Sequence, residues 1–127
     1  MKVIIDSYAW IEYLDGTLAG LKVREILKGN NEVYTLHLNI SEVISRVKRK
    51  GGDIEMAYKA MVSNSSLINL NSEIAKETGL LHAEIRKKIK DFGLVDCYIL
   101  LFARKINAKI LTGDPHFKGF KEAILIK

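Results

Sequence analysis

The chain has 127 residues, is 48% hydrophobic with a single proline, and carries a formal net charge of +5 at pH 7. These values fit one globular domain, 1–127, and exclude a disordered chain, while the lack of a long apolar run argues against a membrane span or a signal peptide. The single cysteine, Cys97, excludes an internal disulfide and favours a reducing cytoplasm.

The first half of the chain alternates short apolar runs with amphipathic stretches. Asp6 or Ser7 is suited to cap a helix directly after the first apolar run, and Gly51 with Gly52 ends a later one. The pattern predicts a buried strand at 3–5, helices at 7–14 and 18–27, a strand at 33–36, and helices at 40–50 and 53–62.

The second half continues the alternation. The pattern predicts a short strand at 67–70, a long amphipathic helix at 72–90, an almost wholly apolar helix at 94–106, and strands at 109–112 and 123–126. Strands that alternate with helices indicate an α/β fold with a central, mainly parallel sheet. Ligands of such sheets bind at the carboxyl ends of the strands.

Four acidic residues interrupt or end apolar runs: Asp6, Glu42, Asp96 and Asp114. Asp6 and Asp114 follow two predicted strands, and Glu42 and Asp96 fall in the first turns of two predicted helices. All four are therefore expected at one edge of the sheet. Carboxylates gathered there would repel one another, and Mg²⁺ or Mn²⁺ is the cation that carboxylate oxygens suit.

Each acid also has a structural explanation. Asp6 can simply cap a helix, Glu42 stands three residues after Asn39 as in a capping arrangement, and Asp114 lies in a turn before Pro115. Asp96 among apolar neighbours is the hardest to explain in this way, although a helix dipole favours an acid in the first turn.

Other chemistries are poorly supported. The three histidines and Cys97 lack the spacing of a zinc site, and no serine-nucleophile or phosphate-loop motif is present. Basic residues instead gather at Arg46, Lys48, Arg49 and Lys50, after Glu42, and these are expected to hold RNA phosphates. A solvated helix end is the alternative, and we favour that alternative for a second cluster at 86–90.

Four segments together resemble the PIN-domain ribonucleases and follow the family's order across nearly the whole chain. They are Asp6-Ser7-Tyr8-Ala9-Trp10-Ile11, Ser41-Glu42-Val43, Val95-Asp96-Cys97-Tyr98-Ile99 and Leu111-Thr112-Gly113-Asp114-Pro115-His116-Phe117. The resemblance implies a three-layer α/β/α fold and a metal-dependent endoribonuclease in which metal-activated water attacks the phosphodiester. A small, stand-alone domain of this kind resembles the toxin of a VapBC-type toxin–antitoxin pair.

The resemblance also assigns roles to residues. It implies that Asp6, Glu42, Asp96 and Asp114 bind Mg²⁺ or Mn²⁺ and that the hydroxyls of Ser7 and Thr112 support them. The chain departs from the family at Tyr8, where Ser or Asn is frequent, and at His116, where some members have a further acid. One metal site is therefore expected, and a second is left open.

The resemblance further implies a protein antitoxin and a homodimer. Apolar side chains at Trp10, Tyr13, Leu14, Met56 and Met61 are candidates for these contacts, with the domain's own core as the alternative. Two other functions stay open at this point: an RNA-processing nuclease without an antitoxin, and a catalytically weak module that binds RNA or protein.

Overall fold

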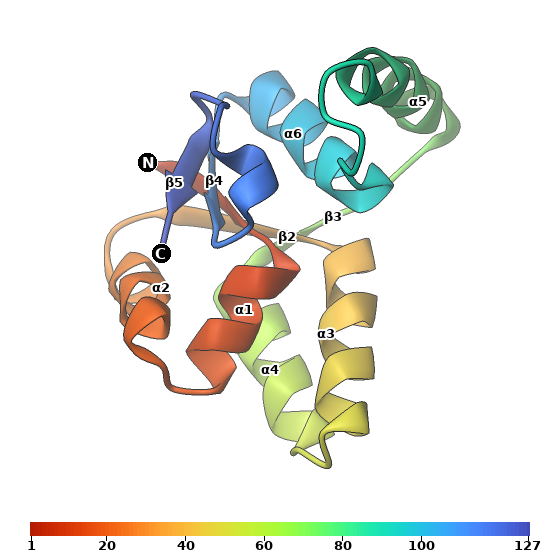
Figure 1. Ribbon diagram of the computed structural model, residues 1–127. Helices are drawn as coiled ribbons and strands as arrows, with labels where there is room; N and C mark the ends of the chain where they lie inside the picture. The colour runs from red at the N-terminus through yellow and green to blue at the C-terminus, as the bar shows by residue number, and fades with distance from the viewer.

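A five-stranded, entirely parallel sheet forms the centre of the computed structural model, which describes residues 1–127 (Figure 1). The strands are β1 (Lys2–Ile5), β2 (Glu32–Leu36), β3 (Ser66–Ile68), β4 (Lys109–Thr112) and β5 (Ala123–Leu125). Their spatial order is β3-β2-β1-β4-β5. The first strand is thus central and pairs with both β2 and β4.

Helices cover both faces of the sheet and complete a three-layer α/β/α fold (Figure 1). The helices are α1 (Ser7–Leu14), α2 (Leu18–Lys28), α3 (His37–Arg49), α4 (Ile54–Asn64), α5 (Ser72–Arg86) and α6 (Leu94–Ile106), with a short 3-10 helix η1 (Pro115–Phe117). The first four lie together below the sheet in Figure 1, and α5 and α6 lie at the upper right.

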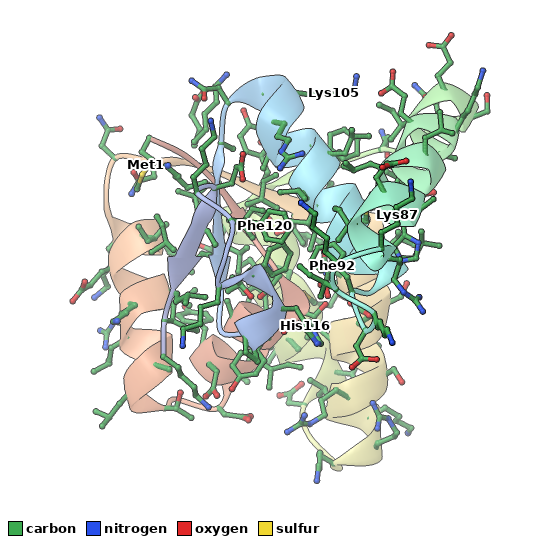
Figure 2. All side chains as sticks on the ribbon, turned by 45° about the horizontal axis from the view of Figure 1, so that its top comes forward. Met1, Lys87, Phe92, Lys105, His116 and Phe120 are labelled. Atoms are coloured by element: carbon green, nitrogen blue, oxygen red, sulfur yellow. The ribbon has the colours of Figure 1, made fainter.

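The sheet separates two hydrophobic cores because successive strand residues point to opposite faces. Val3 and Ile5 pack on the side of α1 to α4, while Ile4 packs on the side of α6. On this second side Phe92 and Phe120 pack together, with ring centroids 5.5 Å apart (Figure 2). Burial on both faces explains why the strands read as continuous apolar runs.

The direction in which strands are added to the sheet reverses between β1 and β4, although all five strands run parallel. After β1 the chain builds outward through β2 and β3, and it then crosses to β4 and β5 on the other side. Such a reversal leaves a crevice at the carboxyl ends of the two central strands, where α/β folds bind their ligands. The residue after β1 is Asp6, and two residues after β4 is Asp114.

The predicted elements are present, and the main differences concern helix ends. The helix α3 begins at His37 rather than at 40, because the chain turns into the helix directly after β2. The prediction that Glu42 lies in the first turn is therefore wrong, and so is the alternative explanation that Asn39 caps the helix: Leu36 is the N-cap and offers no side-chain hydrogen bond. The helix α5 ends at Arg86 instead of 90.

Two residues proposed for intermolecular contacts belong to the chain's own core. Trp10 and Met61 are fully buried. The Trp10 indole N–H donates to the Thr35 hydroxyl at 3.1 Å, which satisfies its one polar group. The prediction that these two side chains face a partner is wrong, whereas Met56 is 55% exposed.

Candidate active site

Asp6 sits where the central strand becomes a helix. It is the N-cap of α1, and its Oδ1 accepts a hydrogen bond of 2.8 Å from the Ala9 N–H. Its own N–H donates to the Leu111 carbonyl of β4 at 3.2 Å. With only 3% of its surface exposed, the Asp6 carboxyl is fixed by the turn from strand to helix.

Thr112 connects Asp6 to Asp114. This buried residue ends β4, and its hydroxyl forms a hydrogen bond to the Asp6 carboxyl. The same hydroxyl oxygen accepts from the Asp114 N–H at 2.9 Å. The hydroxyl uses both its donor and its acceptor capacity, so one side chain sets the relative positions of two acids from different loops.

Glu42 is held by a small polar network between α1 and α3. The Ser7 hydroxyl donates to Glu42 Oε1 at 2.6 Å. The Asn39 amide donates to the Ser7 Oγ at 2.8 Å and also approaches Glu42 Oε1 at 3.3 Å. Ser7 therefore contacts the acidic cluster through Glu42.

Asn39 is a member of this network that the sequence-based assignment of the site missed. Only 1% of its surface is exposed, and it shares the buried face of α3 with Val43. A polar residue one helical turn before a core valine requires hydrogen-bonding partners. That position was the available signal, but reading Asn39 as a cap concealed it.

Asp96 lies in the first turn of α6, as predicted, and faces the other acids from the opposite side of the crevice. Gly93, the N-cap of this helix, offers no side chain to compete for the space. A Cβ placed there would lie 3.3 Å from Asp96 Oδ2. The glycine therefore leaves the carboxylate room at the positive end of the helix dipole.

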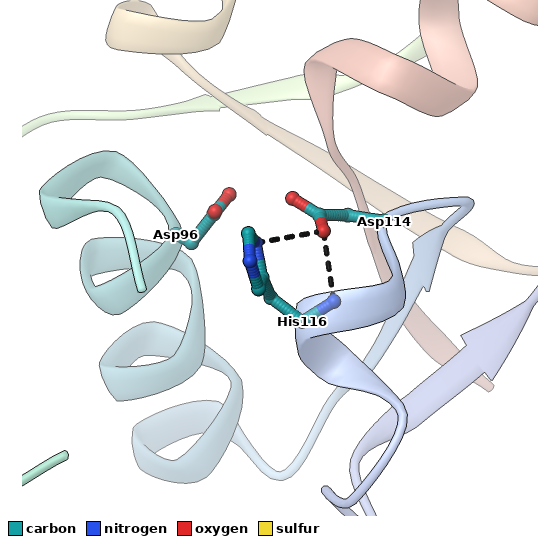
Figure 3. Close-up of side chains that lie close together, drawn as sticks. All are labelled: Asp96, Asp114 and His116. Atoms are coloured by element: carbon teal, nitrogen blue, oxygen red, sulfur yellow. Dashed lines mark hydrogen bonds and ion pairs between the residues drawn. The ribbon is translucent and has the colours of Figure 1, made fainter. Parts of the chain in front are cut away.

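His116 joins the acids, although sequence analysis assigned it no role in the cluster. Figure 3 shows its ring beside Asp114 and Asp96. Its Nδ1 is 3.1 Å from Asp114 Oδ1, and its backbone N–H donates to the same oxygen at 2.8 Å. One ligand atom from each of Asp96, Asp114 and His116 lies within 4.8 Å of the others, an arrangement that can hold a metal ion.

All four predicted acids line a single cavity of about 300 Å³ at the carboxyl ends of β1 and β4. Asp6 and Glu42 are outside the tightest group around His116 but open onto the same space. The donor atoms are mostly carboxylate oxygens. Such a set fits a hard divalent cation such as Mg²⁺ or Mn²⁺.

Burial and mutual repulsion raise the pKa of two of these acids. Burial raises the pKa of Asp6 to about 7, against the opposing effect of its hydrogen bonds from Thr112 and Ala9. Burial, followed by the charges of Asp114, Asp6 and Glu42, raises the pKa of Asp96 to about 7. Without a cation, the cluster therefore holds protons near neutral pH.

The predicted basic cluster divides into two parts. Arg46 and Arg49 line the carboxylate cavity, whereas Lys48 and Lys50 do not. Lys50 lines a neighbouring hollow together with Arg46. In the second cluster, Lys87 forms an exposed ion pair of 3.1 Å with Glu84, consistent with a solvated helix end.

Comparison with known proteins gives a consistent picture. The family model for the PIN domain matches residues 3–123. No curated protein matches the chain significantly. No helix of the chain has the length and apolar character that crossing a membrane requires.

Several solved structures share the fold. A DNA-bound VapBC from Salmonella typhimurium has a TM-score of 0.75 at 16% identity, with 100% of this chain and 99% of that chain covered. The sarcin-ricin loop cleaving toxin VapC20 of Mycobacterium tuberculosis gives 0.74 at 14%, with 94% and 97% covered. A toxin–antitoxin complex from Klebsiella pneumoniae gives 0.73 at 19%, with 98% of both chains covered.

Proposed function

This chain belongs to the PIN-domain family, and from that premise we propose that it is a metal-dependent endoribonuclease and the toxin of a VapBC-type toxin–antitoxin pair. We place the single domain in the cytoplasm, because that compartment contains RNA and keeps an unpaired thiol such as that of Cys97 reduced. The observation that carries the proposal is that Asp6, Glu42, Asp96 and Asp114 converge on one cavity. This cavity lies where the order of the strands in the parallel sheet reverses.

The four acids would hold Mg²⁺ or Mn²⁺, with His116 beside Asp96 and Asp114. When bound, the cation supplies a water of lowered pKa and withdraws charge from the phosphate. The residues around the acids hold the carboxyl groups in position. Thr112 and Ala9 hold Asp6 in place, while Ser7 and Asn39 hold Glu42.

Two arginines are placed to receive the negative charge of the substrate. Arg46 and Arg49 line the cavity that the acids line, one or two turns further along α3 than Glu42. Guanidinium groups bind phosphate oxygens in a bidentate manner without reading the base. They would thus attract RNA to a cavity that is otherwise acidic.

An antitoxin has a suitable docking surface away from the acids. A groove of about 670 Å³ lies between α1, α2 and α4, with an apolar lining that includes Tyr13, Leu14, Leu21, Leu27 and Met56. Arg24 and Lys28 also line it. An amphipathic helix with acidic flanks fits such a groove, and the similar structure from Klebsiella pneumoniae is a toxin–antitoxin complex. We further propose that the free toxin is a homodimer.

RNA cleavage tests the function. Wild type and Asp96→Asn should be purified without antitoxin and incubated with total RNA under Mn²⁺, Mg²⁺ or a chelator, followed by mapping of the new ends. We expect wild type to cleave at discrete positions only with the metal. Metal-independent cleavage, or equal cleavage by both proteins, would refute the proposal.

The partner and the assembly need separate measurements. Co-expression with the adjacent open reading frame should suppress cleavage if that frame encodes the antitoxin. Light scattering of the free protein at micromolar concentration tests the homodimer. A mass equal to the chain's own 14.3 kDa would contradict it.

A further inference from the structure

The ring of Tyr8 lines the carboxylate cavity and lies against the loop that carries Asp114. A Cβ placed on Gly113 would overlap Tyr8 Cδ1 and Cε1 and lie 3.0 Å from Cζ, so the ring rests directly on the Gly113 backbone. The backbone of Gly113 does not itself require glycine, because Gly16 and Gly51 are the only glycines with a positive φ. What excludes a side chain from position 113 is therefore the Tyr8 ring.

Other contacts hold the ring in place. Tyr8 is half-buried in the first turn of α1 and packs on the core between this helix and the sheet. The Lys127 ammonium lies over the face of the ring, 5.0 Å from its centroid, as in a cation–π contact. The same ammonium lies 2.9 Å from Oε1 of Glu12, one turn further along α1. These contacts oppose movement of the ring away from Gly113.

The loop before Asp114 is thus fixed from two sides. On the side of the sheet, the Thr112 hydroxyl accepts from the Asp114 N–H at 2.9 Å. On the side of α1, the Tyr8 ring packs on Gly113. Because Asp114 follows Gly113 directly, a shift of Gly113 would move the Asp114 carboxylate relative to the acids on the other elements.

We propose that Tyr8 is a positioning residue for the metal centre, because its packing on Gly113 keeps the Asp114 loop in the geometry that binds the cation. The inference rests on the proposed metal-dependent function and adds a residue outside the acids and their hydrogen-bonding partners. Ser or Asn, which are frequent at this position in the family, would leave Gly113 uncovered. In this chain, packing of an aromatic ring therefore takes over the support of the loop.

A set of variants separates the ring from its hydroxyl and from a general loss of packing. Tyr8→Ser removes the ring, whereas Tyr8→Phe removes only the hydroxyl. Gly113→Ala disturbs the same contact from the other side, and it should be made alone and together with Tyr8→Ser. Tyr34→Ser is the matched control, because Tyr34 is also half-buried but belongs to β2 and does not line the carboxylate cavity.

The affinity for Mn²⁺, measured by calorimetry, is the first readout. Tyr8→Ser and Gly113→Ala should each weaken binding about tenfold, the size typical of losing an outer contact. Adding Gly113→Ala to Tyr8→Ser should change the affinity by less than about twofold, because the ring that excludes the Cβ is gone. Tyr8→Phe and Tyr34→Ser should both bind as wild type does. An unchanged affinity in Tyr8→Ser, an equal loss in Tyr8→Phe, or an equal cost of Gly113→Ala in both backgrounds would overturn the proposal.

Amide hydrogen exchange of the metal-free protein, followed by NMR, is the second readout. The Asp114 N–H, which donates to the Thr112 hydroxyl, should exchange roughly tenfold faster in Tyr8→Ser than in wild type, while the amides of β2 keep their rates. Tyr8→Phe should restore the wild-type rate. A uniform acceleration across the sheet would show that the ring only stabilises the fold, and it would overturn the positioning role.

The two readouts keep the failure of this inference distinct from the failure of the proposed function. If wild type and Tyr8→Ser bind Mn²⁺ equally, the metal centre stands and the role of Tyr8 is refuted. If wild type binds no Mn²⁺, the metal-dependent function fails, and hydrogen exchange at Asp114 still decides whether Tyr8 holds the loop.

Discussion

Asp6 and Asp96 face each other across the candidate active site and are held in opposite ways. Asp6 accepts hydrogen bonds from the Ala9 N–H and the Thr112 hydroxyl, and both lower its pKa. For Asp96, burial, the charges of the neighbouring acids and a hydrogen bond with Asp114 all raise the pKa. The protein thus stabilises the charge of Asp6 in part, whereas Asp96 depends on a cation for compensation.

This contrast indicates how the site divides its tasks. The Asp6 side is preorganised by the fold, so we expect its geometry to be the same with and without metal. On the Asp96 side, burial and the neighbouring acids outweigh the helix dipole and raise the pKa, so ionisation of Asp96 and the binding of a cation are coupled. Substitutions on the two sides should therefore differ in what they change.

The largest expected effect is that of Asp96→Asn on cleavage. The amide keeps the shape but removes a ligand charge worth several kcal/mol, so we expect kcat to fall roughly a thousandfold. Apo stability should hold or rise, because the substitution removes carboxylate repulsion. Mn²⁺-dependent RNA cleavage and thermal unfolding measure the two quantities, and a destabilised variant would contradict the repulsion assigned to Asp96.

Thr112→Val should act on the Asp6 side with a smaller effect. The change removes the hydroxyl that bonds the Asp6 carboxyl and accepts from the Asp114 N–H. Loss of such an outer contact typically costs about 10- to 100-fold in metal affinity or activity. Thr112→Ser keeps the hydroxyl and should restore most of the activity. If the Thr112→Ser and Thr112→Val variants have the same activity, the hydroxyl does not position the acids.

Substitution of Arg46 and Arg49 tests the cationic part of the cavity, which is separate from Asp6 and Asp96. Changing both to Ala should weaken RNA affinity about tenfold for unrelated sequences and flatten its salt dependence. Metal affinity should change little by comparison, as calorimetry with Mn²⁺ can check. If the RNA affinity at low salt equals that of wild type, the two arginines belong to a solvated helix face and do not bind RNA.

The smallest expected effect is the pH dependence of apo stability. Asp6 and Asp96 have a folded-state pKa of about 7, above the usual value of 3.8, so the folded state binds more protons between these two values. Their contribution is fully present below about pH 4 and is lost as the pH rises through 7. Thermal unfolding should show the apo protein losing roughly 5 to 15 °C between pH 5 and pH 8.

Asp96→Asn should reduce that loss of thermal stability between pH 5 and pH 8, since it removes one of the two titrating groups. Asp91→Asn, an exposed aspartate just before α6, is the matched control and should leave the loss as in wild type. Identical pH profiles for all three proteins would show that Asp96 is not the group responsible.

The sequence was sufficient for the fold and for the main acids, because both depend on local patterns. Apolar runs followed by helix caps placed β1, α1 and β4 to within a residue, and α6 at its observed bounds. The family match and the parallel sheet agree with that prediction. The convergence of Asp6, Glu42, Asp96 and Asp114 on one cavity followed from connectivity alone.

What the sequence did not reveal depends on tertiary contacts. Asn39 resembled a cap because nothing local shows that α3 starts at His37, directly after β2. His116 joins Asp96 only because η1 lies against the start of α6. Trp10 and Met61 resembled surplus apolar surface because their contacts come from α1 and α4 packing on the sheet.

Calorimetric titration of Mn²⁺ into wild type, Asp96→Asn and Asp91→Asn tests the central claim most directly, namely that the acids form a metal centre completed by Asp96. The account predicts saturable binding to wild type and Asp91→Asn at pH 8, a marked loss of affinity in Asp96→Asn, and weaker binding to wild type at pH 5, where the acids retain protons. Equal affinity for Mn²⁺ in all three proteins would contradict it.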